Sequence, residues 1–107
     1  MISRKLVVVR NGGNVAQTNR LRDLDARLID HYIDIDSARY PGGRADARLR
    51  QSAVSVWVII AYLPIYNNDL DKVADHFVIS REEVEAAIAY YHCNKEFVDA
   101  RIELNRA

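Results

Sequence analysis

The sequence predicts a mainly helical domain with a helix-turn-helix core, short β-strands near its N-terminus and a long C-terminal helix. The segment over residues 55–63 is almost wholly apolar, and two later segments open on side chains that cap helices. The β-branched runs come before residue 50. A chain of 107 residues has room for one hydrophobic core. We therefore expect one folded unit, with residues 1–31 as an extension and residues 32–107 as the main domain.

The extension combines a strand with a helix. Residues 6–9 form a β-branched run, and the glycine- and asparagine-rich residues 11–14 stop it at a turn. Apolar side chains then recur at three- and four-residue steps, as on one face of a helix. They are Leu21, Leu24, Leu28 and Ile29. This spacing predicts a short helix over residues 20–30.

Two further strands are expected before the core. Residues 31–36 alternate between apolar and polar side chains, which is typical of a strand. The chain then enters a loop at residues 37–43, which contains a Pro-Gly-Gly run. Residues 45–50 alternate more weakly and predict a third, short strand.

The core helix is predicted to begin after Ser55 and to run through residues 56–63, where it should be buried on most sides. A turn at residues 67–69 follows. Asp69 is in position to cap a short helix that ends at Phe77.

The clearest local signal is the segment Ser-Arg-Glu-Glu that starts at Ser80. A serine followed three residues later by Glu83 forms a capping box, in which each residue satisfies a backbone amide of the other. No glycine or proline interrupts the chain after this point. We therefore predict one continuous helix from Arg81 almost to Ala107.

Four segments, in this order, resemble the bacterial family catalogued as domain of unknown function 433. They are Gly42–Leu49, Val54–Ile60, Val73–Phe77 and Arg81–Tyr91. The resemblance covers about residues 32–93, although residues 50–53 replace the glycine-rich segment that many members have. It implies a three-helix, homeodomain-like domain that acts as an antitoxin and neutralises a PIN-like ribonuclease toxin.

The charge distribution bears on nucleic-acid binding. Net charge is zero, but residues 1–50 carry ten cations and six carboxylates, whereas residues 51–107 carry five and nine. The predicted second helix of the helix-turn-helix opens on acidic residues, so we expect weak binding to arbitrary duplex DNA. The nucleic-acid-binding candidates are Arg44, Arg48, Arg50, Lys72 and Arg81. The alternative is that these cations are simply solvated surface.

The predicted last helix carries an apolar stripe that exceeds one small core. The stripe includes Val84 and Ile88 and then continues through Tyr91, Val98 and Ile102. We interpret these last three residues as a homodimer interface. The alternative is that the helix folds back onto the strands of its own chain.

Other function classes are disfavoured. A lone Cys93 cannot form an intramolecular disulfide, so we expect a cytoplasmic protein, and no apolar run reaches the length of a membrane span. We expect no catalytic residue, metal or cofactor, because His31, His76 and His92 have no metal-ligand spacing. Three hypotheses remain. They are an antitoxin-like module that also binds operator DNA, a stand-alone DNA-binding transcriptional regulator, and, least favoured, a small metal-dependent hydrolase.

Overall fold

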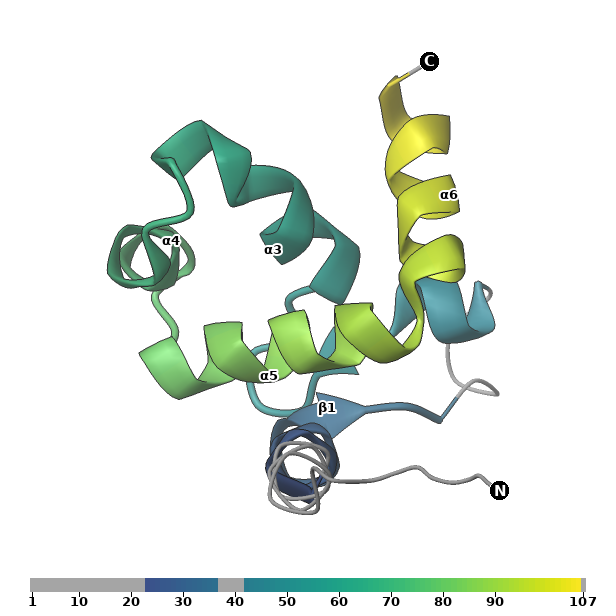
Figure 1. Ribbon diagram of the computed structural model, residues 1–107, viewed down its shortest axis with the longest axis horizontal. Coiled ribbons are helices and arrows are strands. Elements are labelled where there is room, and N and C mark those ends of the chain that lie inside the picture. Colours follow the sequence, from purple (N-terminus) through teal and green to yellow (C-terminus); the bar gives the residue numbers. More distant parts are fainter. Residues whose placement is uncertain (1–22, 37–41, 107) are drawn as a thin grey trace, which may run out of the picture.

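The computed structural model describes residues 23–36 and 42–106, and this part of the chain is mainly helical with one small antiparallel sheet (Figure 1). The elements in chain order are a helix over residues 23–32, β1 (Ile33–Asp34), the 3-10 helix η2 (Gly43–Asp46), β2 (Arg48–Leu49), α3 (Val56–Tyr62), the 3-10 helix η3 (Pro64–Tyr66), α4 (Leu70–Phe77), α5 (Arg81–Cys93) and α6 (Lys95–Arg106). The predicted strand over residues 6–9 and its turn lie outside the described residues. Within the described ranges, no helix has the length and apolar character that crossing a bilayer requires.

Both predicted strands are present, but each is only two residues long. In the antiparallel pair β1–β2, Ile33 lies opposite Leu49, and both side chains are buried. The first strand is short because the preceding helix continues to Tyr32, whose side chain packs against the core. The second is short because a carboxylate oxygen of Asp46 accepts a hydrogen bond from the Gly42 amide at 3.0 Å and holds η2 as a turn.

Helix α5 lies at the centre of the fold. Figure 1 shows α3 and α4 on one side of it, β1 and the helix over residues 23–32 on the other, and α6 leaving from its C-terminal end. Three alanines on α5, at 86, 87 and 89, are buried, and their small side chains let the surrounding elements approach closely. A helix with a small-residue patch on its buried face therefore organises the core.

The two predicted caps of α4 and α5 are confirmed. The Asp69 side chain accepts hydrogen bonds from the amides of residues 71 and 72, at 3.1 and 3.2 Å. The Ser80 hydroxyl accepts from the Glu83 amide at 3.1 Å, and the Glu83 carboxylate accepts from the Ser80 amide at 2.9 Å. The capping box is complete, so α5 begins where the sequence predicts.

Helix α3 departs from its prediction in two ways. Ser55 stands at the N-cap position, but its side chain makes no capping hydrogen bond. One face of α3, carrying Val56, Ile59 and Ile60, is buried, whereas Trp57 on another face is only partly buried. The expected burial on most sides is therefore met on one face only.

The prediction of one continuous helix after Arg81 is wrong. The helix is interrupted at Asn94. The side-chain amide of Asn94 donates to the Tyr90 carbonyl at 3.1 Å, and its backbone carbonyl accepts from the Val98 amide at 3.1 Å. Asparagine competes with the helical backbone for hydrogen bonds, which favours a break here. Helix α6 then leaves the end of α5 at a steep angle (Figure 1), packs on α3 and η2, and buries Val98 completely.

Candidate functional site

The turn between α4 and α5 displays an apolar side chain on an unfavourable backbone. Val78 caps the C-terminus of α4 with φ 56° and ψ 49°, and it is 90% exposed. The left-handed region is costly for any residue with a Cβ, and a β-branched residue there is an outlier. Helix C-caps of this geometry favour glycine, yet here the position carries a valine that faces solvent.

The neighbours of Val78 explain why the turn has this shape. Phe77 and Ile79 both pack against the core, so the chain must reverse within a single residue. The Ile79 amide donates to the Ala74 carbonyl at 3.0 Å, and the Val78 amide donates to the Asp75 carbonyl at 3.3 Å. These contacts hold the backbone of Val78 in the left-handed conformation, whatever its side chain.

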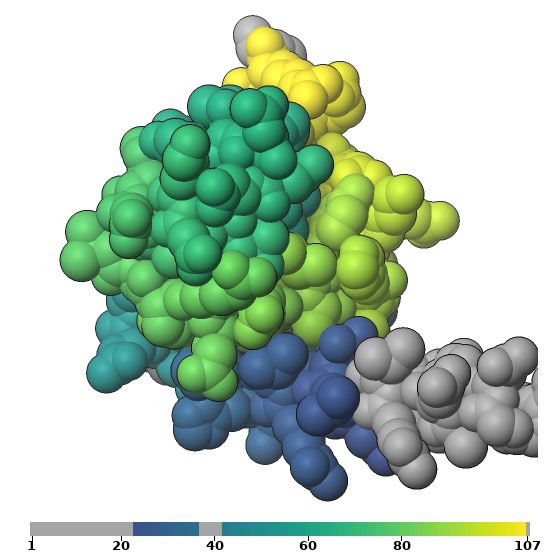
Figure 2. Space-filling view, turned by 60° about the vertical axis from the view of Figure 1, so that its left-hand side comes forward, coloured from purple at the N-terminus to yellow at the C-terminus, as the bar shows by residue number. Residues whose placement is uncertain are grey.

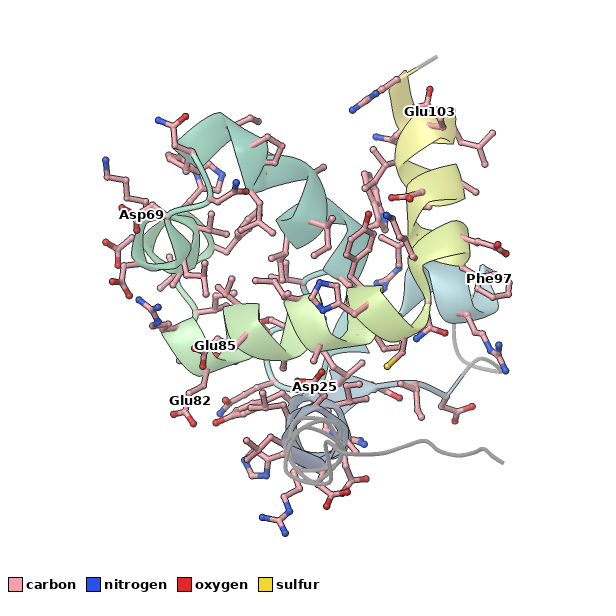
Figure 3. The ribbon with its side chains drawn as sticks, in the orientation of Figure 1. Asp25, Asp69, Glu82, Glu85, Phe97 and Glu103 are labelled. Atoms are coloured by element: carbon pink, nitrogen blue, oxygen red, sulfur yellow. The ribbon has the colours of Figure 1, made fainter. Side chains whose placement is uncertain are left out.

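Carboxylates surround this turn. We call residues 69–85 the α4–α5 unit; its six carboxylates and two cations give it a formal charge of −4. Glu82 and Glu85 lie at the start of α5, next to this turn, and Asp69 lies on the same side of the molecule at the far, N-terminal end of α4 (Figure 3). Asp71 and Asp75 on α4 are also exposed. The exposed valine therefore stands in a strongly acidic surface.

The cation at the start of α5 is already paired. The Arg81 guanidinium lies 3.1 Å from an Asp71 carboxylate oxygen and 3.6 Å from a Glu85 carboxylate oxygen. The hydrogen bond to Asp71, followed by its charge, raises the pKa of Arg81 above its ordinary value. With two carboxylates beside it, Arg81 adds little positive potential for a phosphate.

The accessible part of α5 is narrow and poor in hydrogen-bond donors. One accessible stripe carries Arg81, Glu85, Ile88 and His92. Glu82, Tyr91 and Cys93 are also at least partly accessible, and the other side chains of α5 are buried. A helix that reads bases presents several arginine, lysine, asparagine or glutamine side chains to the groove. This stripe presents a paired arginine, a glutamate, an isoleucine and a histidine.

The structure does not bring the five predicted nucleic-acid-binding residues together. Lys72 and Arg81 belong to the acidic α4–α5 unit. The Arg44 carbonyl accepts a 2.6 Å hydrogen bond from the Tyr90 hydroxyl. Tyr90 is nine residues after Arg81 on α5, which corresponds to about 14 Å along the helix, so Arg44 lies well away from Arg81. Arg48 lies in β2, and the Arg50 side chain donates to a backbone carbonyl, that of residue 30, at 3.3 Å. No single basic patch forms from these five residues.

Of the three predicted dimer residues, Tyr91 and Val98 lie near the joint between α5 and α6, and Ile102 lies further along α6, beside α3. Val98 is fully buried, and Ile102 packs partly against the same core. The Tyr91 hydroxyl donates to an Asp99 carboxylate oxygen at 2.8 Å, which raises the pKa of Tyr91. Because α6 packs on α3 and η2, these side chains contact their own chain, and Val98 is not exposed at the surface of a single copy. The homodimer interpretation of the three residues stays a prediction.

Sequence reasoning missed an aromatic cluster on α3, η3 and α4. The Tyr66 hydroxyl lies 2.8 Å from Nδ1 of His76, and the ring of Tyr62 lies 4.7 Å from that of His76 and 5.1 Å from that of Phe77. The four-residue spacing of the two tyrosines was the available signal. Across residues 23–36 and 42–106, no three His, Cys, Asp or Glu side chains are grouped as metal ligands.

Comparisons with protein families, curated proteins and solved structures found no match to this chain.

Proposed function

We propose that this chain is a non-enzymatic, antitoxin-like binding module whose α4–α5 unit, arranged as a helix-turn-helix, contacts a protein partner. The observation that carries the proposal is Val78, an apolar side chain that is 90% exposed on a left-handed backbone within an acidic surface. The homeodomain-like arrangement and the antitoxin role follow the resemblance to domain of unknown function 433, and the exposed valine and the acidic charge support a protein partner.

The position of Val78 favours a protein contact over a purely structural role. Its side chain buries little apolar area, and its backbone conformation costs free energy, so the valine weakens the isolated chain. Strained residues of this kind cluster at functional sites. An apolar side chain with charged residues around it also has the anatomy of an interface anchor, a desolvated centre inside a polar rim.

The charge of the surface indicates which partner fits. A formal charge of −4 on the α4–α5 unit repels the phosphates of duplex DNA. It attracts a protein surface that carries cations around an apolar hollow. A ribonuclease must hold RNA phosphates with such cations, so a module of this charge can cover the substrate-binding surface of a toxin of that class.

The test uses the product of the reading frame adjacent to this gene as the probe. We expect the wild-type chain to bind it and to suppress its ribonuclease activity. Val78→Gly and Asp75→Arg should each weaken binding at least tenfold, because the first removes the apolar anchor and the second reverses a rim charge. Ile35→Ala, at an apolar residue that is 59% exposed and outside the unit, is the matched control and should bind as wild type does.

Binding to a random duplex at physiological salt provides the opposing measurement. The proposal expects only weak binding, whereas a DNA-binding regulator would bind and would lose affinity when Arg44, Arg48 and Arg50 are replaced by alanine. If the adjacent gene product does not bind, or if Val78→Gly binds it as tightly as wild type, the proposal is overturned.

A further inference from the structure

The charge excesses of this chain are gathered in two segments. Residues 1–22, which we call the basic segment and which lie outside the described residues, hold five of the fifteen cations and no carboxylate. Residues 51–68 hold no charge, and residues 86–107 hold three cations and three carboxylates. The α4–α5 unit therefore carries the whole acidic excess of the second half of the chain. Formal charges of +5 and −4 face each other in one molecule.

The basic segment carries an apolar run between cations. Residues 6–9 are Leu-Val-Val-Val, with Arg4 and Lys5 before them and Arg10 after them. The surface around Val78 has the opposite charges in the same arrangement, because there an exposed apolar side chain lies among carboxylates. A contact between the two would bury apolar area at its centre and pair opposite charges at its rim.

Two carboxylates beside Val78 are accessible to such cations. Asp75, three residues before Val78, and Glu82, four residues after it, are both exposed. Among the described residues neither of them has an ion pair, because Arg81 is paired with two other carboxylates of the unit. A cation brought to Asp75 and Glu82 would therefore gain an attraction that the described residues do not supply.

The helix that follows the basic segment lies beside this surface. Leu24 and Tyr32, on the helix over residues 23–32, line the same surface hollow as Glu82. Figure 2 shows this helix directly below the face formed by α4 and the start of α5. Residues 11–22 separate the apolar run from the helix, and twelve extended residues span up to about 40 Å. Since Glu82 is only four residues from Val78, this length is enough to reach Val78.

We propose that residues 4–10 of the same chain cover the acidic surface around Val78. The short connection holds the two at an effective concentration of about millimolar, which a second copy at micromolar concentration does not match. A phosphate backbone is the weaker competitor for the basic segment, because residues 23–107 carry a formal charge of −5 and repel phosphates.

The contact regulates access to the α4–α5 unit. This consequence rests on the proposed function, because the covered surface is the one assigned to the protein partner. The partner then binds only the fraction of chains in which the surface is open, and its apparent affinity falls by that fraction. Exposed ion pairs weaken as the salt concentration rises, so salt should open the surface.

Carbodiimide cross-linking of the full chain, read by mass spectrometry, tests the contact, because the reagent joins a lysine only to a carboxylate that touches it. We expect Lys5 to couple to carboxylates of the α4–α5 unit at low salt and to lose this coupling at about 1 M salt. Arg4→Glu with Arg10→Glu should lower the yield about tenfold, since two attractions become repulsions. Lys95→Glu with Arg106→Glu, which reverses two exposed cations on α6, is the matched control and should leave the yield unchanged.

A mixture of ordinary and isotope-labelled chains shows whether the joined peptides come from one chain or from two. Coupling only between chains would assign the surface to a second copy and overturns the inference. So does a Lys5 that couples to Glu96 or Glu103 as readily as to the α4–α5 unit. Coupling that disappears when a random duplex is added at low micromolar concentration would assign the basic segment to nucleic acid and also overturns it.

Binding of the adjacent gene product separates this inference from the proposed function. Arg4→Glu with Arg10→Glu should bind that product several-fold more tightly than the matched control does, because its surface is uncovered. If the product does not bind while Lys5 couples to the α4–α5 unit, the proposed function fails and the contact stands. If the product binds and Lys5 does not couple to the unit, the contact fails and the proposed function stands.

Discussion

Replacing Val78 by glycine should make this protein more stable, although it deletes an apolar side chain. The left-handed backbone costs a residue with a Cβ roughly 1–2 kcal/mol, and glycine avoids that cost. Glycine adds conformational entropy to the unfolded chain, worth about 0.5–1 kcal/mol. The side chain is 90% exposed, so little burial is lost. The difference is a gain of about 0.5–1 kcal/mol in the free energy of unfolding.

Thermal and urea denaturation of the two proteins measure this difference. For a domain of this size, the gain corresponds to a rise in Tm of roughly 2–8 °C. Ile35→Gly is the control, because Ile35 is also exposed and β-branched but does not have a positive φ. That variant should lose about 0.5–1 kcal/mol. If Val78→Gly lowers the midpoint as Ile35→Gly does, the backbone of Val78 is not strained and the argument for its role in binding loses its basis.

Three other predictions concern the helices. Val98→Ala should lower the free energy of unfolding by about 2–3 kcal/mol, because the side chain is buried within one copy. Val98→Asp should unfold the chain at all protein concentrations. A folded, monomeric Val98→Asp protein would contradict this placement. Ser80→Ala should lose about 1 kcal/mol through the capping box, and an unchanged urea midpoint would refute that role. The pKa of Tyr91 is raised in the folded chain by its hydrogen bond to Asp99, so the stability from this bond is present below about pH 10 and is lost as the pH rises through the folded pKa. Tyr91→Phe should therefore lose less stability than wild type between about pH 8 and pH 11.

The local sequence signals near α4 and α5 predicted the structure well. Asp69 and Ser80 have side chains that satisfy the first amides of a helix without help from distant residues. Asn67 and Asn68 both adopt positive φ in the turn before α4, a conformation that asparagine tolerates. The start of each helix was therefore predictable from a few adjacent residues.

The candidate site was only partly predictable. The acidic character of residues 69–85 is visible in the sequence, and it led to the expectation of weak DNA binding. Nothing in the local sequence indicates that Val78 is left-handed, because β-branched residues favour extended backbone. Its conformation results from burying Phe77 and Ile79 on either side of a single residue.

The sequence by itself determined where the side-chain caps of α4 and α5 lie, which segments are apolar and how the charge divides between the halves, because these properties depend on residue type and short spacings. Only the tertiary structure decided the path after Asn94. The apolar spacing of Val98 and Ile102 is equally compatible with a straight helix that binds a partner and with a separate helix that packs on its own chain. The second is realised because α3 and η2 offer an apolar surface on which Val98 loses all contact with water.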